Sequence, residues 1–103
     1  MQKITHRYPG HSSEEIFERV RTGLWARRRE ISHHDIIDKI LGAVKWDTRR
    51  LRGGGSKRVL LVKSSAEIRV VGDEVQVELD IPFKNYEQKY CERVGTILES
   101  LFD

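Results

Sequence analysis

The segment Arg49 to Arg58 holds the densest group of chemically capable residues, with five cations and three consecutive glycines in ten positions. Glycines expose backbone N–H groups and cations supply charge, and together these can surround a phosphate. A P-loop, however, needs four residues between its first glycine and Gly-Lys-Ser/Thr and must open a helix, whereas here a strand-like apolar run, Val59 to Val62, follows. We therefore predict that Gly53 to Gly55 form a turn between two strands, and that the cations discourage pairing with another chain.

Basic residues are concentrated in the first part of the chain. Residues 1 to 58 carry 14 Lys and Arg against 7 Asp and Glu, whereas residues 59 to 103 carry 5 against 9, for a net charge of +3. This asymmetry is typical either of a solvated face or of a surface that binds nucleic acid or another anionic surface. Binding is the alternative function, and it requires the arginine clusters to meet on one surface. Its candidate contacts are Arg27, Arg28, Arg29, Arg49, Arg50, Arg52, Lys57 and Arg58.

The histidines and the single cysteine do not have the spacing of a metal site or a nucleophile. His6 and His11 are five residues apart across a Pro-Gly break, and His33 and His34 are adjacent, so that on a helix they point apart. Cys91 falls in the last predicted helix near its apolar stripe, where a cysteine usually acts as a small hydrophobe. We expect no metal, no cofactor and no catalytic residue, and therefore a protein that is not an enzyme.

The elements that must position these residues begin with a short strand and a helix. Residues 3 to 8 alternate apolar and polar side chains and stop at a Pro-Gly pair, which predicts a strand. Ser12 and Glu15 form a capping box before an apolar helical stripe, and a bend then precedes a second helix over residues 36 to 41. Trp46 opens an extended stretch as its apolar anchor.

From residue 57 to residue 83 the apolar period changes to two. The pattern predicts strands at residues 59 to 62, 68 to 71 and 75 to 81, the last with one wet face, and Asn85 then caps a long amphipathic helix. The expected fold is a single α+β domain over residues 1 to 103. An antiparallel sheet of four to five strands has two helices inserted after strand one and the C-terminal helix packed on it, in the order β-α-α-β-β-β-β-α.

The apolar side chains of the sheet and the helices can either fill a solid core or enclose a ligand. The second possibility is a small binding module, in which an apolar small molecule or an apolar segment of a protein partner lies between the sheet and the C-terminal helix. Its candidate lining is Phe17, Trp46, Leu79, Ile81, Tyr90, Val94 and Leu98. An open sheet edge also favours a homodimer.

Composition restricts the location of the protein. No apolar run approaches the roughly 20 residues that span a bilayer, so we expect no membrane span. The first nine residues contain no apolar signal-peptide stretch, and one lone cysteine offers no disulfide framework. A cytoplasmic location is the simplest expectation.

The predicted order of elements resembles a shortened helix-grip fold, the architecture of START-like and Bet v 1-like lipid-binding proteins. Residues 4 to 8 and 13 to 20 look like the first strand and helix of that superfamily. The chain is also similar to the small polyhydroxyalkanoic acid system protein family, through His6, Arg19, Trp46, the hairpin over residues 67 to 79 and the helix over residues 86 to 101. The resemblance implies a ligand held between a curved sheet and the final helix.

Overall fold

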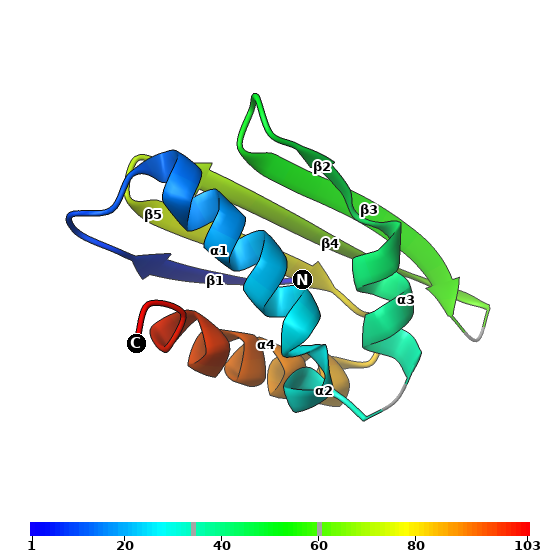
Figure 1. Cartoon of the computed structure of the whole chain (residues 1–103). Coiled ribbons are helices and arrows are strands. Elements are labelled where there is room, and N and C mark those ends of the chain that lie inside the picture. The colour runs from blue at the N-terminus through cyan, green and yellow to red at the C-terminus, as the bar shows by residue number, and fades with distance from the viewer. Residues whose placement is uncertain (34, 60) are drawn as a thin grey trace.

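The computed structural model describes residues 1–33, 35–59 and 61–103. It is an α+β fold, in which a five-stranded antiparallel sheet with strand order β1-β5-β4-β3-β2 carries the described helices on one side (Figure 1). The elements in chain order are β1 (Gln2–Arg7), α1 (Ser13–Ala26), α2 (Arg28–Ile31), α3 (Asp35–Ala43), β2 (Lys45–Asp47), β3 (Arg52–Val59), β4 (Val62–Val71), β5 (Glu74–Asp80) and α4 (Lys84–Glu99). The predicted fold class is confirmed.

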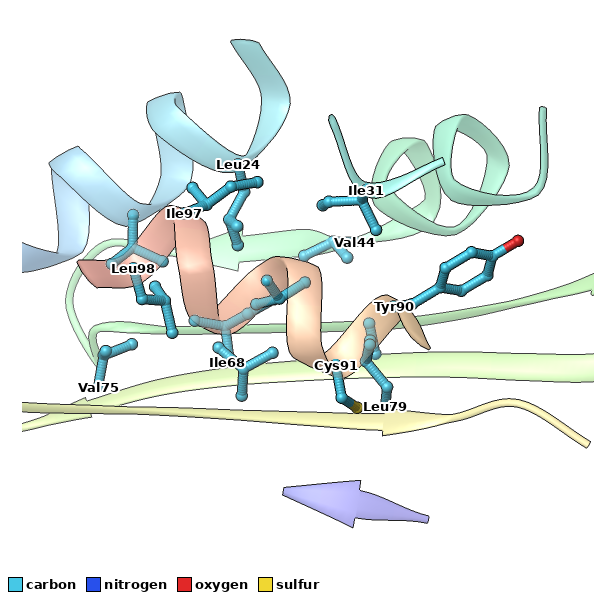
Figure 2. Close-up of a cluster of buried hydrophobic side chains, with 14 of the residues drawn as sticks. Leu24, Ile31, Val44, Ile68, Val75, Leu79, Tyr90, Cys91, Ile97 and Leu98 are labelled. Carbon is cyan, nitrogen blue, oxygen red and sulfur yellow. The ribbon is translucent and has the colours of Figure 1, made fainter. Parts of the chain in front are cut away.

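The hydrophobic core lies between the helices and one face of the sheet. Every second residue of β4 is buried, as in Ala66, Ile68 and Val70, because successive side chains of a strand point to opposite faces. The C-terminal helix α4 contributes side chains such as Tyr90 and Leu98. Figure 2 shows this cluster, which draws on α1, α4 and the sheet. The prediction that the C-terminal helix packs on the sheet is therefore confirmed.

The opposite face of the sheet, which we call the open face, is polar. On β4 it carries residues that alternate with the buried ones, among them Glu67 and Arg69, and on β5 it carries Gln76 and Glu78. Arg52 of β3 lies directly opposite Arg69. This alternation confirms the wet face predicted for the strand over residues 75 to 81.

The prediction that Gly53 to Gly55 form a turn is wrong, because all three lie within β3 and the turn precedes them at residues 48 to 51. Gly53 and Gly55 are on the helix side. A Cβ on Gly55 would lie 2.2 Å from the Ala43 carbonyl oxygen, and one on Gly53 would lie 2.6 Å from the Trp46 ring. The glycines therefore allow the end of α3 and the strand that follows it to lie directly on β3.

Other boundaries differ from the predicted ones. The prediction of one strand over residues 59 to 62 is wrong: Val59 ends β3, Leu61 lies in a turn, and Val62 begins β4 and pairs with Val59. Leu60 and His34 lie outside the described residues. The capping box is confirmed in part, since Ser12 Oγ accepts from the Glu15 N–H at 3.2 Å. The helix α4 begins at Lys84 with no side-chain cap, so Asn85 is not its cap.

In the described part of the chain, no helix combines the length and the apolar character needed to cross a bilayer.

Candidate functional site

An apolar groove lies between α1, α3 and β2. Its volume is about 370 Å³, and we call it the tryptophan groove because both tryptophans of the chain line it. The lining residues are Arg21, Thr22, Leu24, Trp25, Leu41, Gly42, Val44 and Trp46. Most of this surface is aliphatic or aromatic, which is the usual character of a small-molecule site.

The floor of the groove depends on the glycines of β3. Trp46 pairs with Gly53 across β2 and β3, and its ring covers the space that a side chain at Gly53 would occupy. The ring also makes an edge contact with Phe17, with 5.8 Å between ring centroids and 80° between planes. Trp46 is therefore held from two sides and forms a fixed part of the floor.

The second tryptophan stands at the mouth of the groove. Trp25 is 47% exposed, and the guanidinium of Arg28 lies 4.1 Å from the centroid of its ring. Arg28 also pairs with Asp38 of α3, with 3.0 Å between Nε and Oδ1. Through Arg28 of α2, this cation–π contact and ion pair connect the end of α1 to α3.

One cation lies at the rim. Arg21 Nη2 is 2.6 Å from Glu18 Oε2 on the same helix, and this hydrogen bond raises the pKa of Arg21 above its ordinary value. The pair is exposed, and exposed pairs exchange readily with other partners. The residues that line the groove include this cation and no carboxylate.

Of the seven predicted ligand-lining residues, the structure places Trp46 in the tryptophan groove and the other six in the core. Phe17, Leu79, Ile81, Tyr90, Val94 and Leu98 are each at most 4% exposed. They lie in one cluster with α4 on the sheet, as predicted, but their side chains pack against one another. Trp25 and Leu41 were not predicted to line a site: Trp25 was given no role, and Leu41 was assigned to the helix predicted over residues 36 to 41.

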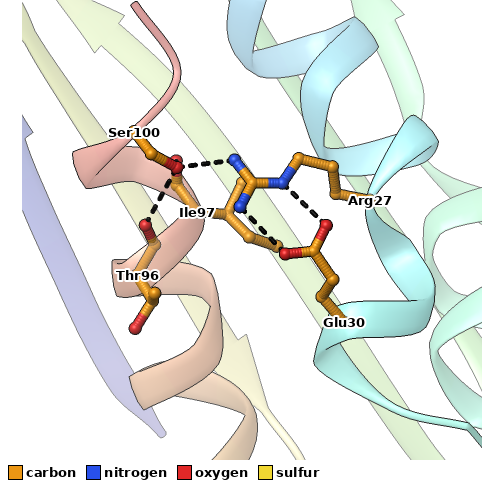
Figure 3. A network of polar contacts seen from close by, with 5 residues as sticks. All are labelled: Arg27, Glu30, Thr96, Ile97 and Ser100. Carbon is orange, nitrogen blue, oxygen red and sulfur yellow. Dashed lines mark hydrogen bonds and ion pairs between the residues drawn. The ribbon is translucent and has the colours of Figure 1, made fainter. Parts of the chain in front are cut away.

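Three of the predicted nucleic-acid contacts already have partners at the ends of α1 and α2. Arg27 binds Glu30 through Nε and Nη2, at 2.8 and 2.9 Å, and donates from Nη1 to Ser100 Oγ at 2.6 Å (Figure 3). Arg28 and Arg29 both pair with Asp38, at 3.0 and 3.3 Å. These arginines join α1 and α2 to α3 and α4.

The other five predicted contacts lie along β3 and the turn before it. Arg49, Arg50 and Arg52 are at the β2 end, whereas Lys57 and Arg58 are at the far end of the strand. Arg58 lies six positions after Arg52 along the strand, a distance of about 20 Å. The eight cations therefore occupy three places on the molecule.

A larger hollow, of about 660 Å³, lies on the open face. Its floor consists of small residues such as Gly54, Ser56 and Ser65, and its walls carry the acidic Glu67 and Glu78. It also includes Asp80, Lys63 and Met1. Charged side chains of both signs surround it, and Met1 is the one large apolar residue among those that line it, so it is a depression over the short side chains of β3 and β4 with little apolar surface to hold a ligand.

The described part of the chain contains one potential nucleophile, Cys91, and several potential metal ligands. Cys91 is buried, and this burial, followed by the charge of Glu87, raises the pKa of its thiol to about 11. A thiol with so high a pKa is a poor nucleophile at neutral pH. Among the described residues, no three His, Cys, Asp or Glu side chains are grouped in a way that could hold a metal ion.

Comparison with known proteins gave no match to a family model, a curated protein or a solved structure. The resemblance to the small polyhydroxyalkanoic acid system proteins and to helix-grip domains therefore stays a prediction.

Proposed function

We propose that this chain is a small non-enzymatic binding module that holds an apolar ligand with an acidic group in the tryptophan groove. The proposal keeps the class of function expected from the sequence and moves the site away from the interface between the sheet and α4. The observation that carries it is a hollow of about 370 Å³ to which both tryptophans contribute.

The shape and the lining of the groove favour an apolar ligand body. Its volume is near the lower end of the range of about 300 to 1,000 Å³ that is usual for ligand sites. Trp25 and Trp46 offer aromatic surface, and Leu41 and Val44 offer aliphatic surface. Water in such a groove has few polar partners, so its displacement by an apolar group is favourable.

The charge at the rim favours an acidic group on the ligand. Arg21 is the single ionised side chain among the residues that line the groove, and its partner Glu18 is exposed. A ligand carboxylate could replace Glu18 and accept two hydrogen bonds from the planar guanidinium. A medium-chain fatty acid or an aromatic carboxylic acid has both required parts.

Intrinsic fluorescence tests this proposal directly, because the only two tryptophans of the chain both lie in the groove. Octanoic acid and 1-naphthoic acid, each compared with its methyl ester, would be titrated into the protein. We expect a saturable change in tryptophan emission, with tighter binding of each acid than of its ester. A linear change, or none, with both acids would contradict the proposal.

Gly42 provides a variant that blocks the groove without damage to the fold. A Cβ at Gly42 meets no atom within 4 Å, and the residue lies in helical conformation near the end of α3. Gly42→Leu should fill the groove and weaken binding by about ten-fold or more, while it stabilises the helix. Gly42→Ala is the matched control, since it adds one methyl group and leaves most of the volume. Equal affinity in the two variants would place the ligand elsewhere.

A further inference from the structure

The turn of the β3–β4 hairpin exposes a leucine. Leu61 is 91% exposed, more than any other large hydrophobic residue in the described part of the chain. Its φ of 67° lies in the left-handed region, which asparagine and glycine adopt far more readily than leucine. Neither packing within this chain nor the backbone conformation accounts for a leucine at this position.

The hairpin carries this leucine beyond the rest of the sheet. The strand β4 begins at Val62, whereas its pairing with β5 begins at Ser65, and β2 pairs with β3 no further than Gly54. Residues 62 to 64 of β4 therefore pair with β3 but not with β5, and they extend the hairpin by about 10 Å. Figure 1 shows the paired ends of β3 and β4 projecting past β1 and β5.

Cations surround the base of the turn. Arg58 lies directly opposite Lys63, and together with Ser56 and Lys57 they line a shallow hollow of about 420 Å³. None of these three cations takes part in an ion pair among the described residues. Like charges opposite each other destabilise a hairpin, so an anion bound in this hollow would relieve the repulsion.

Exposed aromatic residues lie at the same end of the molecule. Asp80, the last residue of β5, pairs with Ser65 near the start of β4, so the beginning of α4 is on the hairpin side. There Phe83 and Tyr86 are both exposed and make an edge contact with each other, and Lys84 lies between them. Exposed aromatic rings next to lysine are typical of surfaces at the bilayer interface.

We propose that this end of the molecule docks on an anionic lipid bilayer. Leu61 enters the interfacial region, and the hollow lined by Lys57, Arg58 and Lys63 receives anionic headgroups. A nucleic acid would use the same cations but would leave the leucine in water, which is why the combination favours lipid. The docking surface shares no residue with the tryptophan groove. Docking therefore goes beyond the function proposed above and does not depend on it.

Sedimentation with vesicles tests the docking surface. Vesicles of phosphatidylcholine alone would be compared with vesicles that contain 30% phosphatidylserine, at low and at high salt. We expect binding to the anionic vesicles only, with weaker binding at high salt because ions screen the attraction. Replacement of Lys57, Arg58 and Lys63 by Gln should weaken binding roughly a hundred-fold.

Leu61 can be replaced by a residue that adopts the native backbone conformation more readily than leucine. Leu61→Asn removes the apolar side chain and adopts positive φ readily, so the hairpin should keep its shape while vesicle binding falls about ten-fold. The matched control is Val71→Asn, which removes a 56% exposed apolar residue at the other end of β4 and should leave binding unchanged.

The same variants identify the outcomes that would overturn the proposal. These are equal binding to neutral and anionic vesicles, no binding to either, or no difference between Leu61→Asn and the wild type. A DNA oligonucleotide that binds through the three cations and is unaffected by Leu61→Asn, while vesicles do not bind, would assign the surface to nucleic acid instead.

Discussion

The two faces of β4 place neighbouring residues of the strand in opposite environments. Ala66 and Ile68 lie under the helices and are sealed from water, whereas Glu67 and Arg69 lie on the open face among other charged side chains. The glycines of β3 show the same contrast, since a Cβ on Gly55 would collide with the backbone of Ala43, whereas a Cβ on Gly54 would make only ordinary contacts. Stability should therefore depend on the helix side, and the open face should tolerate substitution.

The largest expected effect is on the free energy of unfolding, and it should differ sharply between the adjacent Gly54 and Gly55. Gly55→Ala places a methyl group 2.2 Å from the Ala43 carbonyl oxygen and 2.6 Å from its carbon, and a backbone cannot move aside as a side chain can. We expect a loss of about 4 kcal/mol in the free energy of unfolding, as for severe overpacking. For Gly54→Ala the nearest atom is 3.8 Å away, so we expect a change within about 0.5 kcal/mol. Urea unfolding of both variants measures the difference, and equal values would contradict the described contact of α3 with β3.

A second pair compares neighbouring side chains of β4. Ile68 is fully buried, so Ile68→Ala should destabilise by about 3 kcal/mol through lost burial and an unfilled cavity. Arg69→Ala, on the open face, should change stability by less than about 0.5 kcal/mol. Thermal unfolding of the two variants would show a large shift of Tm for the first alone. A comparable shift for both would mean that the open face is covered in solution.

Much of this contrast could be predicted from the sequence, because it depends on local periodicity. The alternation over residues 75 to 81 identified β5 and its wet face, and the capping box placed the start of α1. The glycines were misinterpreted for a physical reason. Consecutive glycines usually indicate a turn, because they adopt more backbone conformations than other residues. Here Gly53 and Gly55 instead leave space, by their lack of a side chain, for residues 43 to 46, which lie about ten residues earlier in the chain.

The tryptophan groove could not be predicted for a related reason. Its walls come from α1, α3 and β2, and Arg28 of α2 contacts both Trp25 of α1 and Asp38 of α3. A sequence pattern can show that each element has an apolar stripe, but the gap between two helices depends on how they pack. Trp46 was predicted because it begins an extended stretch as its largest apolar side chain, whereas Trp25 was given no role.

A third comparison uses thiol chemistry. Burial raises the pKa of Cys91 to about 11, so at pH 8 its thiolate fraction is about a hundred-fold below that of an exposed thiol of ordinary pKa. We expect Cys91 to react with a disulfide reagent at least a hundred-fold more slowly than a cysteine introduced at Lys63 on the open face, in a Cys91→Ala background. Both proteins should react at similar rates in urea, and fast reaction of native Cys91 would show that α4 opens frequently.

The smallest expected effect concerns one buried hydroxyl group. Tyr8 Oη donates a hydrogen bond to the Leu98 carbonyl oxygen near the end of α4, at 2.5 Å. Tyr8→Phe removes the donor and leaves that carbonyl buried, so we expect a loss of about 1 kcal/mol at pH 7. Thr5→Val, a loss of a hydroxyl group on the exposed part of β1, should have almost no effect.

The same tyrosine gives this contribution a pH dependence of defined sign. Burial raises the pKa of Tyr8 in the folded chain, whereas in the unfolded chain Tyr8 ionises near pH 10. Above about pH 10 the unfolded state therefore releases a proton that the folded state retains, and the free energy of unfolding falls as the pH rises. Phenylalanine at this position cannot ionise, so the difference between the wild type and Tyr8→Phe should shrink between pH 9 and pH 11. A difference that stays constant over this interval would mean that water reaches the hydroxyl group and that the end of α4 is not sealed against β1.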